Sequence, residues 1–89
     1  MPLHLFESVR ASGSVPQDWL PDRFSPIKLR IHNEPLLKHL RELRPGRWRK
    51  VLKGGSCGEI HYFEHESGAV AGVKFFPVES LNQRFEKET

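Results

Sequence analysis

The order of hydrophobic and polar residues predicts a strand followed by a helix in the middle of the chain. In residues 27–32 (IKLRIH) hydrophobic residues alternate with basic ones, which is typical of a half-buried strand with one basic face. Asn33 is a favourable N-cap, and Pro35 suits a first helical turn. Leucines at 36, 37, 40 and 43 form one stripe at helical spacing, and a Pro-Gly pair follows. We expect a helix from about Glu34 to Arg44 that packs its leucines on a sheet.

Three further segments have the character of strands. They are residues 48–53 (WRKVLK), 59–64 (EIHYFE) and 69–76 (AVAGVKFF), and short loops that contain glycine join them. Such loops are typical of hairpins, and consecutive hairpins form an antiparallel meander. The expected fold class is therefore α+β, with one or two helices packed on a three- to four-stranded antiparallel sheet.

The N-terminal segment, residues 1–26, lacks a clear period. Three prolines divide it, so we expect it to be ordered but irregular, apart from a short helix over about residues 3–11. Trp19, Leu20 and Phe24 are expected to anchor the segment on the rest of the protein, because large apolar side chains contribute most when they are buried.

Length and composition bound what the chain can be. Its 89 residues, 37% hydrophobic and 28% charged, fit a single domain and exclude a large enzyme. We expect one domain over residues 1–89, with a β-α-β-β-β core at 27–77 and a tail at 78–89 that forms at most a short helix. Cys57 is the only cysteine, which rules out an intrachain disulfide and a cysteine-rich zinc site.

The sequence gives indirect indications of location. The opening MPLHLF does not read as a signal peptide, and no stretch is long and apolar enough to span a membrane, so we expect no membrane partner. A lone cysteine favours a reducing compartment. A cytoplasmic site of action is therefore expected, and a domain released from a longer secreted protein is the alternative.

Charge is distributed unevenly along the chain. Ten basic and two acidic residues lie between Arg23 and Lys53, a net of +8, whereas the other positions hold four basic and nine acidic residues, a net of −5. This asymmetry predicts a polyanionic partner, with RNA the leading candidate and an acidic inhibitor or antitoxin protein the alternative. The predicted nucleic-acid-binding residues run from the helix into the next strand: Lys38, Arg41, Arg44, Arg47, Trp48, Arg49, Lys50 and Lys53. The competing interpretation is a solvated basic face with Trp48 in the core.

Residues 58–68 (GEIHYFEHESG) contain the candidate catalytic residues. On a strand, His61 and His65 share one face while Tyr62 lies on the other. We expect His61 to face solvent from the side of the sheet that is not covered. Histidine transfers protons near neutral pH, and metal-independent RNA cleavage needs a proton acceptor, a proton donor and cations. Because the spacing of the two histidines on a strand separates them, and no third ligand is evident, we expect no metal and no other cofactor.

The order of elements resembles a known superfamily. The amphipathic helix, the basic turn PGRWRKV and the strands ending in IHYF and GVKFF resemble the small bacterial ribonuclease toxins of the barnase, EndoU, colicin and RelE-like superfamily. The resemblance covers residues 33–76 and is one of architecture, without an invariant motif. It implies RNA cleavage from an open sheet face, with His61 as acid or base and with Tyr62 or His65 assisting. The cations that it implies at the phosphate are Arg47, Lys53 and Lys74.

Three functions follow from these observations. The leading hypothesis is a metal-independent endoribonuclease of the toxin type, with His61, His65, Tyr62 and Lys74 as the catalytic set. The second is a non-enzymatic nucleic-acid-binding module that uses the same basic residues. The third is a small interaction protein whose basic face meets an acidic protein.

Overall fold

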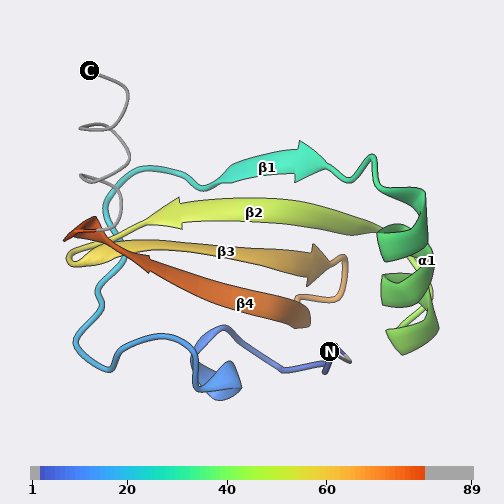
Figure 1. The fold of residues 1–89 in the computed structure, drawn as a ribbon, viewed down its shortest axis with the longest axis horizontal. Helices are drawn as coiled ribbons and strands as arrows, with labels where there is room; N and C mark the ends of the chain where they lie inside the picture. The colour runs from blue at the N-terminus through green and yellow to red at the C-terminus, as the bar shows by residue number, and fades with distance from the viewer. Residues whose placement is uncertain (1–2, 80–89) are drawn as a thin grey trace.

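A computed structural model describes residues 3–79 and contains one antiparallel sheet with one α-helix (Figure 1). The elements after the N-terminal segment are β1 (Ile27–Arg30), α1 (Glu34–Leu43), β2 (Trp48–Gly54), β3 (Gly58–His65) and β4 (Val70–Pro77). The strands lie in the order β1-β2-β3-β4, and every neighbouring pair is antiparallel. The predicted α+β class and the meander are confirmed.

Helix α1 begins and ends where local sequence signals place it. The Asn33 side chain accepts a hydrogen bond from the Leu36 amide at 3.1 Å, and the Arg44 amide closes the last turn on the Leu40 carbonyl. Leu40 is fully buried, whereas the other three leucines of the stripe are half-buried. The reason is visible in Figure 1: α1 lies against one end of the sheet, beside the start of β2, and does not run across it.

The two faces of the sheet have different environments. One face, which we call the covered face, packs against the N-terminal segment, where Val15 and Trp19 form a buried cluster with Ile60 of β3. The opposite face, called the open face, carries His61 and Phe63. Close to α1 it is closed by a second cluster that contains Trp48, but on β1 Ile27 and Leu29 are 57% and 43% exposed. The open face is therefore covered at one end and accessible at the other.

Trp19 fixes the N-terminal segment to the covered face. Its indole Nε1 donates to the Gly58 carbonyl at 3.0 Å, and its ring lies directly over Gly55. A Cβ at Gly55 would fall 2.2 Å from Trp19 Nε1, so only glycine leaves space for the ring there. The expected anchor at Trp19 is confirmed, with 3% of the residue exposed.

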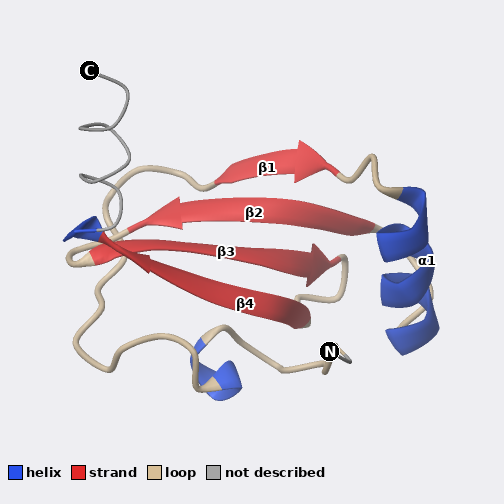
Figure 2. Ribbon diagram, in the orientation of Figure 1, coloured by secondary structure: helices blue, strands red, loops and turns tan. Residues whose placement is uncertain are grey.

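Other expectations for the N-terminal segment are wrong. In place of a helix over residues 3–11 there is a short 3₁₀ turn at Arg10–Ser12 and an extended stretch in which Phe6 and Val70 exchange two backbone hydrogen bonds of 2.8 Å (Figure 2). Pairing with the outer edge of β4 satisfies backbone groups that an isolated short helix would leave weakly bonded. Leu20 and Phe24 are each 64% exposed, so they do not anchor the segment.

Two further expectations concern the edges of the fold. The expectation that β1 is half-buried is wrong: all four of its residues are exposed, because β1 is an edge strand and neither core cluster of the described residues includes its side chains. The short helix predicted in the tail lies mostly outside the described residues. Within residues 3–79, no helix has the length and hydropathy needed to cross a lipid bilayer.

Candidate nucleic-acid interface

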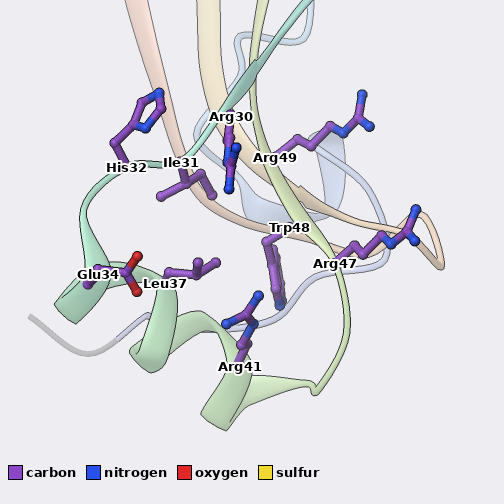
Figure 3. A pocket seen from close by; sticks show the side chains of 9 residues that line it. All are labelled: Arg30, Ile31, His32, Glu34, Leu37, Arg41, Arg47, Trp48 and Arg49. Carbon is purple, nitrogen blue, oxygen red and sulfur yellow. The ribbon is translucent and has the colours of Figure 1, made fainter.

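A cavity of about 610 Å³ lies where the end of β1, helix α1 and the start of β2 meet (Figure 3). Four arginines line it: one at the end of β1, one on α1, one directly before β2 and one within β2. They are Arg30, Arg41, Arg47 and Arg49. The remaining lining residues are Ile31, His32, Glu34, Leu37 and Trp48.

The four arginines do not play the same part. Arg30 and Arg41 approach the cavity from opposite sides, with Trp48 between them, whereas Arg47 and Arg49 extend away from it on one side (Figure 3). Arg41 takes this position because it stands one turn after Leu37, on the same side of α1. The cavity thus has two inward guanidinium groups beside an apolar wall, and two more cations at its border.

Charge in this cavity is largely uncompensated. Among the described residues, carboxylates form ion pairs with Lys28, Lys53 and His61, and none lies within 4.0 Å of any of the four arginines. Glu34 is the single acidic residue of the lining. A guanidinium group presents a fork of donors that matches two oxygens of a phosphate, so the cavity suits an anion with several phosphates.

Sequence reasoning found part of this cluster. Arg41, Arg47 and Arg49 were predicted and are brought together, but Arg30 was missed as a site residue, although its place in the alternating strand marked it as part of a basic face. Lys38 is exposed on α1 and does not line the cavity. Arg44 is also exposed, and its guanidinium donates to Ser67 Oγ at 3.0 Å.

Two predicted nucleic-acid-binding residues have structural roles instead. Trp48 is 5% exposed, its Nε1 donates to the Arg44 carbonyl at 2.9 Å, and its ring meets that of His65 edge-on. A buried ring cannot stack on a base, so the core interpretation of Trp48 is the correct one. Lys53 lies on the covered face, where its Nζ is 2.8 Å from Asp22 Oδ1 and also donates to the Asp22 and Phe24 carbonyls.

The candidate catalytic residues are separated by the fold. His65 is 5% exposed, with Nδ1 2.8 Å from Ser67 Oγ and Nε2 2.8 Å from the Pro45 carbonyl, so both ring nitrogens hold a turn together. Tyr62 lies on the covered face, where burial, together with the charge of Glu64, raises the pKa of its hydroxyl. The ring nitrogens of His65 are thus occupied within the protein, and the ring of Tyr62 packs on the face opposite His61.

His61 and Lys74 do come together on the open face. They are register partners on β3 and β4, and they line a hollow of about 140 Å³. His61 Nε2 lies 2.7 Å from Glu59 Oε1, and its ring packs at 4.4 Å on that of Phe76. The complete lining of the hollow is Lys50, His61, Tyr62, Phe63, Gly72, Lys74 and Phe76.

The contact with Glu59 determines what His61 can do. A carboxylate that accepts from Nε2 favours the tautomer with the proton on that nitrogen, which leaves Nδ1 as the proton acceptor. Lys74 and Lys50 supply positive charge nearby. His61 can therefore accept a proton at Nδ1 from a ligand whose anionic group lies near Lys74 and Lys50. Across residues 3–79 there is no cluster of three or more histidine, cysteine, aspartate or glutamate side chains that could hold a metal ion.

Comparison of the chain with protein-family models, with curated proteins and with solved structures finds no match.

Proposed function

We propose that this protein binds single-stranded RNA and that the arginine-lined cavity holds the phosphates of the strand. The observation that carries the proposal is that Arg30, Arg41, Arg47 and Arg49 line one cavity and that, among the described residues, no carboxylate lies within 4.0 Å of any of them. Neutralising phosphates with such cations releases counterions, which supplies most of the affinity of proteins for nucleic acids. A strand rather than a duplex is favoured, because the one α-helix within residues 3–79 lies against the end of the sheet and does not stand clear of it to enter a groove (Figure 1).

Fluorescence anisotropy with labelled oligoribonucleotides tests this function. The double variant Arg30→Gln/Arg41→Gln is expected to bind at least about tenfold more weakly than the natural chain, because each arginine contributes charge-assisted hydrogen bonds. Lys38→Gln is the matched control, since it removes one exposed charge of α1 that does not line the cavity. Unchanged binding by the double variant, or an equal loss in the control, would contradict the proposal. Co-purification with an acidic protein instead of RNA would favour the interaction-protein alternative.

The second candidate function is metal-independent RNA cleavage of the kind expected from the toxin resemblance. It is supported by His61, Glu59 and Lys74 lying together on the accessible part of the open face. In this mechanism His61 Nδ1 takes the proton of a ribose 2′-hydroxyl, and the 2′-oxygen attacks the adjacent phosphorus. The bond from phosphorus to the 5′-oxygen then breaks, and Lys74 protonates the leaving oxygen. The products are a 2′,3′-cyclic phosphate and a free 5′-hydroxyl, and solvent restores both side chains.

Incubation of the pure protein with total RNA in EDTA tests cleavage. The natural chain is expected to produce ends with cyclic phosphates, His61→Ala is expected to leave the RNA intact, and Glu59→Gln is expected to slow the reaction by about tenfold or more. Intact RNA with micromolar natural protein would leave RNA binding as the function. Cleavage that survives His61→Ala would point to a contaminating nuclease.

A further inference from the structure

We propose that the hollow on the open face is a binding site for one unpaired nucleobase of the RNA strand. The site is distinct from the arginine-lined cavity, because the two share no lining residue. It is built on β2, β3 and β4, near the accessible half of the open face. The inference rests on the proposed RNA binding, which it extends from phosphate contacts to a contact with a base.

The shape of the hollow comes from a glycine in β4. The register of β3 and β4 shifts between His61 and Phe63, and Gly72 in the irregular part has a φ of 60°, which favours glycine. A Cβ at Gly72 would lie 3.0 Å from Phe63 Cδ2. The absence of a side chain at Gly72 lets the Phe63 ring pack directly against its backbone, and both residues line the hollow.

Aromatic rings and cations surround this space in the combination that nucleotides require. Phe63, Phe76 and His61 offer ring surfaces, and Phe63 and Phe76 are both half-buried, so part of each ring stays accessible while the rest is held by the fold. Bases stack on such rings when single-stranded RNA lies on a sheet. Lys50 and Lys74 are exposed, and in the described part of the chain neither lies within 4.0 Å of a carboxylate. Their ammonium groups are therefore available to the phosphates on either side of a bound base.

The composition of the hollow favours a nucleotide over an acidic peptide. A peptide carboxylate would pair with the lysines but would gain little from the rings, whereas a base with its phosphates uses both. Glu59 does not line the hollow, and its carboxylate is directed to His61 Nε2, so none of the lining residues is acidic and both lysines of the lining face the ligand without a carboxylate among them.

The experiment compares two RNA strands that differ only in their bases. One is a labelled oligouridine of about eight nucleotides, and the other is an abasic ribose-phosphate strand of the same length and charge. We expect the natural chain to bind the oligouridine about tenfold more tightly than the abasic strand, because stacking of one base is worth roughly that factor. Phe76→Leu is expected to remove this preference without weakening binding of the abasic strand. Phe76→Tyr keeps a ring and is expected to retain the preference, and thermal unfolding establishes that both variants are folded.

Each outcome has a distinct meaning. Equal binding of the two strands by the natural chain overturns the base site and leaves the arginine-lined cavity in place. A preference for bases that persists in folded Phe76→Leu also overturns the site. Weak binding of both strands that is insensitive to Arg30→Gln/Arg41→Gln overturns the proposed function itself. A deoxyribose strand with the same bases tests the class of ligand, and equal preference there would extend the site to single-stranded DNA.

Discussion

Lys53 of β2 and Asp22 of the N-terminal segment are joined by an ion pair in which Nζ lies 2.8 Å from Oδ1. The same ammonium also donates to two carbonyls of the segment, so one side chain holds the turn before β1 against the covered face. Lys53 belongs to the predicted nucleic-acid-binding residues, but its ammonium group is used for folding and is withdrawn from any ligand. Basic residues that follow one another along the chain therefore do not all lie on one surface.

The Lys53–Asp22 pair predicts a dependence of stability on pH. Hydrogen bonding from Lys53 lowers the pKa of the Asp22 carboxyl below its ordinary value. The contribution to stability is therefore complete above the unfolded-state pKa of about 3.9 and is lost as pH falls through the lowered folded-state pKa. Asp22→Asn should melt at a lower temperature than the natural chain at pH 6, and the difference should shrink towards pH 2. Asp18→Asn, in the same segment, is the control, and a difference that is constant over this range would contradict the prediction.

The arginine-lined cavity predicts a change in the salt dependence of binding. For single-stranded nucleic acid the logarithm of affinity falls with the logarithm of salt concentration with a slope of about −0.7 per phosphate contact. Replacing Arg30 and Arg41 together by glutamine should make the slope shallower by about 1.4, whereas Lys38→Gln should leave it nearly unchanged. Binding measured by anisotropy between low and physiological salt gives the slope directly, and equal slopes for all three proteins would exclude phosphate contacts at these arginines.

The position of Trp48 predicts a stability effect without a binding effect. Trp48→Phe removes the hydrogen bond from Nε1 to the Arg44 carbonyl and leaves a small void, which should lower the free energy of unfolding by about 1–3 kcal/mol. Denaturant unfolding measures this loss. Phenylalanine keeps an apolar ring between Arg30 and Arg41, so the folded variant should retain RNA binding, and loss of binding would restore the stacking role that the sequence suggested.

The two histidines of β3 predict opposite results. His65→Ala removes a buried ring whose two nitrogens contact the Pro45 carbonyl and the Ser67 hydroxyl, which should cost about 2–4 kcal/mol of stability. His61→Ala should cost less than about 1 kcal/mol, because its side chain is partly exposed and lies on the open face. Denaturant unfolding checks both values. A severe loss of stability in His61→Ala would assign a structural role to the residue that is proposed for cleavage.

Local signals in the sequence were sufficient for the regular elements. The helix was expected over residues 34–44 and covers Glu34–Leu43, because an Asn cap and a Pro-Gly pair define its ends independently of the fold. The pairing of Phe6 with Val70 could not be predicted, since the contact joins segments that are 64 positions apart and no local pattern marks it. The helix expected over residues 3–11 does not form, because this segment pairs with β4 instead.

The candidate site was predicted in part for the same reason. Net charge identified Arg41, Arg47 and Arg49, because charge can be counted along the chain without knowledge of the fold. The burial of a side chain cannot be obtained from the sequence by such a count. Trp48 and His65 carry polar atoms that are satisfied by carbonyls and hydroxyls of turns, and only the tertiary structure shows these partners. Alternation on β3 placed His61 and Tyr62 on opposite faces, but it could not reveal that the face of Tyr62 is covered.

The exposed edge at β1 has a consequence for how the protein behaves at high concentration. An edge strand presents unpaired backbone groups that can template the strand of another molecule, and apolar side chains at Ile27 and Leu29 would strengthen such a contact. Lys28 and Arg30 alternate with them, and since Lys28 is paired with Glu64, the net positive charge of this edge lies at Arg30. Two copies that met edge to edge would bring like charges together, so the positive charge of this strand disfavours self-association.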